Sequence, residues 1–216
     1  MQDFLKVMGM VIGSFPVNEY DKRIVILTRE CGKITAFVKG ARRQGSRFLA
    51  STDLFCFGTF ELFVGRNSYN VQNAEISNFF ECFRDDILGA YYGMYFMELI
   101  DFYTRENNDS SMELLLLYRA LQGLKSDKLD NLFVKTIFEL KLFIVEGELI
   151  PLEKIGNVTD KAYSVVMNHI YNSDIEGLFN FKVEEDVLNE LIRIADYERK
   201  HLIDRPIKSL SVLETL

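Results

Sequence analysis

The sequence has few of the residues that form metal sites and disulfide frameworks. It contains three cysteines, Cys31, Cys56 and Cys82, and two histidines, His169 and His201. No two cysteines are close together, so the sequence predicts neither a disulfide framework nor a structural zinc site, and it suits a reducing compartment. We therefore expect that the protein needs no metal and no cofactor.

Long apolar runs are also absent. No stretch reaches the roughly eighteen apolar residues that a membrane span requires. The N-terminal residues MQDFLKVMGMVIGSFP alternate like a strand and lack the pattern of a signal peptide. Hydrophobic residues make up 48% and charged residues 26% of the chain, as in ordinary globular domains. The sequence thus predicts a cytoplasmic protein with no membrane contact.

Catalytic motifs are missing as well. No glycine-rich loop ending in Gly-Lys-Ser or Gly-Lys-Thr is present, which argues against an ATP site. Both histidines lie on predicted helices, far in sequence from the cysteines, so a Cys–His nucleophile is disfavoured. Two acidic runs, Asp85-Asp86 and Glu184-Glu185-Asp186, could bind Mg²⁺ in a nuclease, but acids at predicted helix starts also favour the helix dipole. We expect no catalytic residue.

What the sequence does contain is an uneven distribution of charge. Residues 1–79 hold ten Lys/Arg and seven Asp/Glu, a balance of +3, whereas residues 80–216 hold fifteen and twenty-five, a balance of −10; together they give the net charge of −7. Residues 22–47 alone hold eight cations and one acid, Glu30. Such clustering in an acidic chain indicates a polyanion-binding half and a half with another role.

The first 79 residues have the pattern of short strands. Apolar and β-branched segments separated by turn residues predict five strands, over residues 6–13, 23–28, 34–39, 54–65 and 69–76. Gly58 lies inside the fourth segment, where an internal glycine indicates a bulge or a sharp bend. Five short strands, one of them bent, predict a small closed barrel of the OB-fold type.

From residue 78 onward the apolar residues recur at helical spacing. The pattern predicts helices over residues 79–102, 110–124, 131–147, 159–173 and 184–202, with Pro206 limiting the last one. We therefore predict an α+β protein, with a five-stranded OB-fold nucleic-acid-binding domain in residues 1–79 and an all-helical domain in residues 80–216.

A basic loop, KGARRQGSRF, joins the third and fourth predicted strands. Arg and Lys neutralise phosphates and release counterions, so such a loop can bind nucleic acid without reading its sequence. A merely solvated loop is the alternative, but the clustering of cations favours polyanion binding. The predicted phosphate contacts are Arg23, Lys39, Arg42, Arg43, Arg47 and Arg66, and the candidate rings for stacking on bases are Phe48, Phe55, Phe57 and Tyr69.

These motifs, in this order, resemble the RecO family of bacterial recombination mediators. The similarity begins in residues 9–48, where a T-x-E-x-G-K hairpin turn (Thr28 to Lys33) precedes the segment KGARRQGSR (Lys39 to Arg47). A Gly-Arg turn that leads to an Ala-Glu strand end follows in residues 65–75, and the C-terminal HLIDRPIKSLSVLETL is similar to the family's closing segment. The N-terminal match covers about seventy residues and is specific, whereas the middle helices match mainly in pattern.

The resemblance implies an N-terminal OB-fold, a helical domain and a function in DNA repair and recombination. It implies binding of single- and double-stranded DNA, annealing of complementary strands, and loading of the RecA recombinase together with RecR, in the bacterial cytoplasm at the nucleoid. Many family members also carry a four-cysteine zinc module in the helical domain. Residues 147–163, where its first pair would fall, contain no cysteine, so we expect no zinc in this chain.

The family also implies that the helical half binds the acidic C-terminal tail of the single-stranded DNA-binding protein. Such a pocket needs apolar walls and a cation for the terminal carboxylate. The candidate cations on apolar helices are Arg119, Lys135, Lys141 and Arg193. Two functions remain open: a mediator that binds DNA, and a protein-interaction adaptor whose OB-fold does not bind DNA appreciably on its own. The salt dependence of DNA binding separates them.

Overall fold

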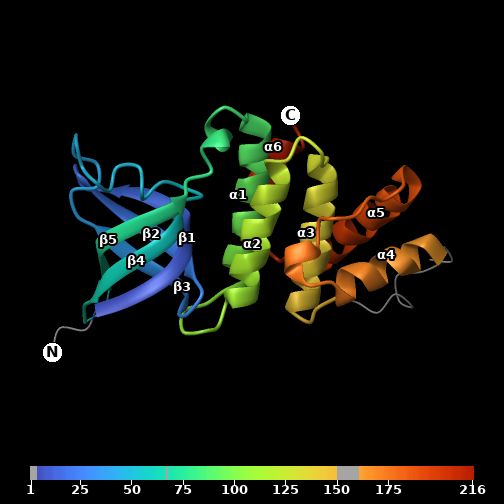
Figure 1. Cartoon of the computed structure of the whole chain (residues 1–216), viewed down its shortest axis with the longest axis horizontal. Helices are drawn as coiled ribbons and strands as arrows, with labels where there is room; N and C mark the ends of the chain where they lie inside the picture. The colour runs from blue at the N-terminus through green and yellow to red at the C-terminus, as the bar shows by residue number, and fades with distance from the viewer. Residues whose placement is uncertain (1–3, 67, 150–160) are drawn as a thin grey trace. The chain divides into compact units, whose positions relative to one another are not determined.

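The structure, a computed structural model, describes residues 4–66, 68–149 and 161–216 (Figure 1). The chain forms two compact units. One unit contains the residues up to Asp85 together with Tyr103–Leu114, and the other contains Asp86–Phe102 together with Leu115–Leu216. We call them the barrel unit and the helical unit. The chain therefore leaves the barrel unit after Asp85 and returns to it for Tyr103–Leu114, from the end of its first α-helix into the first turn of its second.

The barrel unit is a closed five-stranded barrel with the strand order β1-β2-β3-β5-β4 (Figure 1). Neighbouring strands run antiparallel except β3 and β5, which are parallel. This arrangement confirms the predicted five-stranded OB-fold barrel followed by helices. The strands are β1 (Phe4–Val17), β2 (Asp21–Thr28), β3 (Gly32–Val38), β4 (Phe57–Val64) and β5 (Tyr69–Asn78).

Alternating side chains fill the inside of the barrel. In β3, the inward positions Ile34, Ala36 and Val38 are fully buried, and the residues between them are partly or largely exposed. Val11 on β1 and Phe60 on β4 belong to the same core. Strands with one buried and one wetted face need this period of two, and each buried Val or Ile contributes about 1.5–3 kcal/mol. The alternation visible in the sequence is therefore what fixes the inner face.

The fourth strand bends at Gly58, as predicted. The register between β4 and β5 shifts between Phe57 and Gly58, and a Cβ at Gly58 would clash with the carbonyl oxygen of Glu75. The predicted start of this strand at residue 54 is wrong, because Phe55 adopts a left-handed backbone with φ 71°. Its N–H donates to the carbonyl of Val11 across 3.0 Å, and β4 begins two residues later, at Phe57.

The described residues after β5 form helices and their connections, as predicted, with different bounds. The helix expected from residue 79 begins only at Ile87, because Phe80 adopts a φ of 48° and is followed by a short 3₁₀ helix. No described helix is long and apolar enough to cross a membrane. The helices are η1 (Glu81–Arg84), α1 (Ile87–Tyr103), α2 (Ser111–Leu124), α3 (Asn131–Val145), α4 (Lys161–Asn172), η3 (Ile175–Gly177), α5 (Glu185–Leu202) and α6 (Lys208–Leu213).

The last helix, α6, was not expected from the sequence. Its first two backbone N–H groups, at Lys208 and Ser209, donate to the carboxylate of Glu98 on α1 across 2.7 and 3.1 Å. A carboxylate at a helix start satisfies donors that have no partner inside the helix. Glu98 lies 110 residues away from Lys208 along the chain, so no local pattern announces this contact.

Candidate nucleic-acid interface

The basic loop, which we define as Lys39–Phe48, is fixed to the barrel at its first residues. The backbone N–H of Gly40 donates to the Asp21 carboxylate across 2.8 Å, and that of Arg42 donates to the Tyr20 carbonyl across 2.9 Å. Between them, Ala41 is fully buried in the barrel core. The acid at the start of β2, Asp21, and the Lys-Gly-Ala-Arg sequence thus act together to position the loop beside the β1–β2 turn.

The far end of the same connection is held by an ion pair. Lys22 on β2 contacts Asp53 across 2.7 Å, and the Lys22 side chain is only 14% exposed. This cation is therefore neutralised within the barrel unit. The remaining cations of the loop therefore lie between two fixed ends. Because the loop is already partly ordered, it loses less conformational entropy when it binds a phosphate chain.

Arg42 has a structural contact in addition to its predicted phosphate contact. Its guanidinium Nη1 donates to the carbonyl oxygens of Asn18 and Glu19 across 3.3 and 3.2 Å. A guanidinium has five N–H donors, so these two bonds leave capacity for a phosphate. Arg42 thus joins the basic loop to the β1–β2 turn and still presents its charge at the surface.

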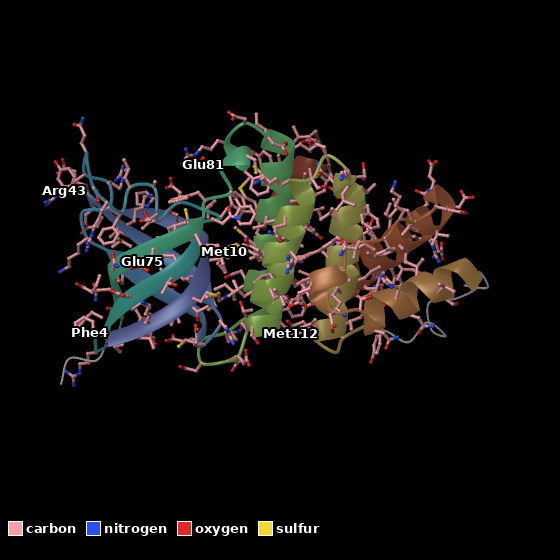
Figure 2. All side chains as sticks on the ribbon, viewed as in Figure 1. Phe4, Met10, Arg43, Glu75, Glu81 and Met112 are labelled. Atoms are coloured by element: carbon pink, nitrogen blue, oxygen red, sulfur yellow. The ribbon has the colours of Figure 1, made fainter. Side chains whose placement is uncertain are left out.

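Three arginines of the barrel unit lie over aromatic rings. The guanidinium carbon of Arg23 is 4.7 Å from the Phe15 ring centroid, that of Arg43 is 5.2 Å from Tyr20, and that of Arg47 is 4.7 Å from Phe48. Figure 2 shows Arg43 at the outer surface of the barrel unit. Bases stack on both aromatic and guanidinium planes, so each pair combines a base-stacking plane with a cation.

The rings of Phe15 and Tyr20 were missed by the sequence analysis. They are 45% and 44% exposed, which is high for such rings and leaves them accessible to a ligand. Phe15 stands opposite Arg23 in the antiparallel register of β1 and β2. Only the pairing of the two strands brings these residues together, because the exposed phenylalanine looks like any other strand residue in the sequence.

A groove next to the loop collects two of the predicted cations. Its volume is about 360 Å³, within the usual range for small-ligand pockets. Arg47 donates to the backbone carbonyl of Gln72 on β5, which places its guanidinium against the groove wall. The groove-lining residues that matter for a nucleic acid are Lys39, Arg47, Phe37, Phe48, Phe63 and Gln72.

The remaining predicted residues lie elsewhere on the barrel unit. Arg66 is exposed in the β4–β5 turn. Tyr69 follows that turn, packs against the barrel core, and forms a hydrogen bond with Glu106. Burial raises the pKa of the Tyr69 hydroxyl, and the bond to Glu106 adds to this. The Tyr69 ring is thus used inside the unit, whereas Arg66 has the exposure that a phosphate contact needs.

The T-x-E-x-G-K motif has a structural explanation. The Thr28 hydroxyl donates to the Gly32 carbonyl across 2.7 Å, and the Glu30 carboxylate accepts from the N–H of Met8 across 3.0 Å. Gly32 has φ +64°, and a Cβ there would clash with the Arg105 carbonyl oxygen, which itself accepts from the N–H of Lys33 across 3.1 Å. The motif therefore shapes the β2–β3 turn and lets the segment after α1 pack against it.

Two family models, for the N- and C-terminal domains of the same protein family, match the chain. The model "Recombination protein O N terminal" matches residues 1–80, and "Recombination protein O C terminal" matches residues 84–152. The chain belongs to the RecO family. RecO proteins act in DNA repair and recombination, so a DNA repair role follows for this chain.

Individual RecO proteins are similar over almost the whole chain. The DNA repair protein RecO of Acetivibrio thermocellus is 26% identical over 245 residues, which covers 99% of this chain and 98% of that protein. That of Clostridium novyi is 27% identical over 242 residues, covering 98% and 94%, and that of Alkaliphilus metalliredigens is 29% identical over 198 residues, covering 89% and 80%.

The RecO zinc module does not fit this chain. Four cysteines are needed, but the chain has three, and all lie between residues 31 and 82 as free thiols. Most of residues 147–163, where the module would begin, lies outside the described part of the structure. Across residues 4–66, 68–149 and 161–216, no group of three or more His, Cys, Asp or Glu side chains is arranged to hold a metal ion.

The acidic runs considered for a nuclease lie at helix starts. Asp86 accepts from the N–H of Gly89 across 2.8 Å in the first turn of α1, and Glu185 and Asp186 form the first turn of α5. His169 contacts the Phe181 ring edge-on at 4.5 Å, and His201 contacts Tyr197 on its own helix. These side chains thus have local contacts that account for their positions.

The four cations considered for a peptide tail have partners within the helical unit. Lys141 is 5% exposed and donates to the backbone carbonyls of Ile170, Tyr171 and Ser173 across 2.9, 3.2 and 2.9 Å. Burial lowers the pKa of its ammonium group. All three protons of Lys141 are used at the end of α4, so it is not available to a peptide carboxylate. Lys135 pairs with Glu139, Arg193 pairs with Glu190, and Arg119 donates to Gln122.

A small cavity of the helical unit has two exposed cations instead. Its volume is about 190 Å³, and Lys128 and Lys182 lie on its rim. Phe133 and Phe181 form an apolar wall, with ring centroids 5.4 Å apart. Apolar walls with cations at the edge are the combination that an acidic, apolar peptide end requires.

Proposed function

We propose that the barrel unit binds single- and double-stranded DNA and that the protein anneals complementary strands and, with RecR, helps load RecA. The observation that carries this proposal is the basic loop, whose arginines lie beside aromatic rings on the surface of a closed OB-type barrel. Membership of the RecO family supports the same direction. Such a function belongs to the bacterial cytoplasm, at the nucleoid where the DNA is.

The loop works by charge neutralisation. Each Lys or Arg that contacts a phosphate releases condensed counterions, and this gain does not depend on the sequence of the strand. Two complementary strands repel one another less once their phosphates are neutralised, so pairing becomes faster. No covalent step is needed, and no base edge has to be read.

The surroundings of the six predicted cations support a role in phosphate binding. Arg42 and Arg47 are held by backbone carbonyls, so their guanidinium groups are already oriented. Arg43 and Arg23 rest on exposed rings, where they can bind a phosphate while the ring stacks on the neighbouring base. Lys39 lines the groove beside Arg47, and Arg66 extends the basic surface at the β4–β5 turn.

The test is fluorescence anisotropy of a labelled single strand across a series of salt concentrations. If about five phosphates are contacted, log K should fall against log salt with a slope of about −3.5. The triple variant Arg42→Ala, Arg43→Ala and Arg47→Ala should make the slope less steep by about 2, because three phosphate contacts are lost. Lys125→Ala is the matched control, because it removes one exposed cation from the helical unit.

Two outcomes would reject DNA binding by the loop. A triple variant with the slope of the unmodified protein would move the phosphate contacts elsewhere. A flat salt dependence for the unmodified protein would instead favour the adaptor, which acts through protein contacts alone. Loss of intact strand in the presence of Mg²⁺ would point to a nuclease, so the integrity of the labelled strand is checked in parallel.

We further propose that the helical unit receives the acidic C-terminal tail of the single-stranded DNA-binding protein. The cavity with Lys128 and Lys182 supports this, since it offers cations for acidic residues and an apolar wall of Phe133 and Phe181. A labelled acidic peptide with a free apolar C-terminus should bind the unmodified protein. The double variant Lys128→Ala and Lys182→Ala should weaken binding about fivefold to thirtyfold, since two exposed pairs at about 0.5–1 kcal/mol each are lost, whereas Lys125→Ala should not weaken it.

A further inference from the structure

A second cavity of the barrel unit lies where the connection after the basic loop ends. Its volume is about 380 Å³, large enough for a ligand of the size of a nucleoside. One wall comes from Asp53 and Phe55, just before β4. Further lining comes from Phe79, Phe80, Phe83 and Arg84, in and next to η1, whose first residue, Glu81, is labelled in Figure 2.

The walls of this cavity are mostly flat rings. The Phe55 and Phe83 ring centroids are 4.9 Å apart, and Phe80 and Phe83 are stacked at 5.9 Å with an angle of 8° between their planes. Phe79 is 37% exposed, so one ring remains open to a ligand. Phe55, Phe80 and Phe83 are buried and pack against one another, so Phe79 offers the ring face on which a flat ligand can stack.

Two of the rings are placed by unusual backbone conformations. Phe55 and Phe80 have φ angles of 71° and 48°, a region that bulky residues rarely adopt. Hydrogen bonds hold both: the N–H of Phe55 donates to Val11, and that of Phe80 donates to the side chain of Asn78 across 2.9 Å. Strained residues cluster at ligand sites. Here both strained positions direct their rings to one cavity.

Polar groups at the cavity match a nucleotide. Arg84 supplies a cation, and Ser14 and Asp53 supply hydrogen-bonding groups. We propose that this cavity takes one unstacked base of a single strand whose phosphates are held by the basic loop, an inference that rests on the proposed function. The base stacks on Phe79, a flanking phosphate contacts Arg84, and Asp53 accepts from an exocyclic amino group, which favours cytosine or adenine.

Continuity with the basic surface selects a base as the occupant. The basic loop begins at Lys39, which lines the first groove, and its continuation ends at Phe55, which lines this cavity. The segment from Lys39 to Phe55 thus contributes to the first groove at its start and to this cavity at its end. Arg84, an exposed cation on the lining of the cavity, would complement a phosphate, which an apolar side chain of a protein would not supply.

Photochemical crosslinking tests the proposal directly. A single strand with one 5-iododeoxycytidine is bound to the full chain, irradiated, digested and mapped by mass spectrometry. We expect crosslinks at Phe79 or Phe83. Crosslinks confined to Phe15, Tyr20 and Phe48 would overturn the cavity while leaving the proposed function standing, and an unmodified protein that binds no strand at low salt would overturn both.

A variant provides an independent readout. Phe79→Ala should weaken binding of an intact strand about tenfold, since base–aromatic stacking supplies about 1–3 kcal/mol, and should leave binding of a strand of abasic sites unchanged. Met112→Ala is the control, because Met112 is a 48% exposed apolar residue of the barrel unit, labelled in Figure 2. If Phe79→Ala does not fold, Ser14→Met fills the cavity and should give the same loss. Equal affinities for intact strand in the variant and the control would overturn the proposal.

Discussion

The two units differ in the surroundings of the charged side chains described below. In the barrel unit, Arg23 and Arg43 lie at the surface with their guanidinium groups over exposed rings. In the helical unit, Glu139 is fully buried and contacts Lys135 across 3.0 Å and Arg199 across 3.4 Å. The first set of charges is available to an outside ligand, and the second is used within the fold. Burial, and not residue type, separates a binding residue from a structural one.

A substitution at Glu139 is expected to lower the stability of the protein more than the other substitutions proposed below. Its carboxylate accepts from the Tyr95 hydroxyl on α1 and from Lys135 on α3, and it faces Arg199 on α5. Glu139→Gln leaves two buried cations with only the partly exposed Asp196 as a counter-charge, so the free energy of unfolding should fall by about 3–5 kcal/mol in urea denaturation. Glu190→Gln, which breaks an exposed pair with Arg193, should cost about 0–1 kcal/mol. Similar losses for both would show that burial does not set the value of these pairs.

Gly32 gives the barrel unit its own structurally sensitive position. Gly32→Ala forces a left-handed φ on an alanine and drives its Cβ into the Arg105 carbonyl, so we expect a loss of about 2–3 kcal/mol in the urea midpoint analysis. Gly45→Ala is the matched control in the basic loop, with φ +75° and nothing within 4 Å of a new Cβ. It carries only the backbone cost, about 1–2 kcal/mol. A Gly45 variant that loses as much as the Gly32 variant would contradict the packing of residues 103–114 against this turn.

The pH dependence of stability should show a smaller effect at Asp196. Burial opposes ionisation of this carboxylate, but Arg199 and Lys135 outweigh it and hold its pKa below the ordinary range. Because the folded pKa lies below the unfolded value of about 3.9, the ionised group stabilises the fold above about pH 4. That contribution is lost as the pH falls through the folded pKa. Urea midpoints from pH 7 to pH 3 should therefore fall less steeply for Asp196→Asn than for the unmodified protein, and parallel curves would exclude this role.

Arg43 is expected to have the smallest effect on stability and a clear effect on DNA. Arg43→Ala should leave the free energy of unfolding within about 0.5 kcal/mol, since the side chain is exposed. It should make the salt slope of single-strand binding less steep by about 0.7, because one phosphate contact is lost. Arg42→Ala should reduce the slope equally but also cost about 1 kcal/mol of stability, because two carbonyl contacts are lost. Indistinguishable stabilities for the two variants would remove the structural role of Arg42.

Elements that depend on local pattern were predicted well. The barrel strands follow from a period of two with turn residues between them, and the long helices follow from apolar residues at helical spacing. The errors lie where a distant group overrides the local pattern. Phe55, held by a bond to Val11, delays the start of the expected fourth strand, and α6 begins on a carboxylate supplied by Glu98.

The candidate site divides in the same way. Its cations could be found from the sequence, because four cationic residues in nine, from Lys39 to Arg47, are visible without any structure. Its rings could not, because Phe15 and Tyr20 meet Arg23 and Arg43 only through the β1–β2 pairing and the return of the loop. Phe48 was considered from its place in the loop, and it does line the groove.

The sequence by itself determined the barrel, the helices and the position of the basic loop, because these depend on periodicity and on charge along a few neighbouring residues. Only the tertiary structure decided which cations are exposed and which are used within the fold. Lys135 and Lys141 look like surface lysines on a helix, yet both are buried, one with Glu139 and one with the carbonyls that end α4. Their partners are set by how elements pack, and the energy of a charge depends on its surroundings more than on its identity.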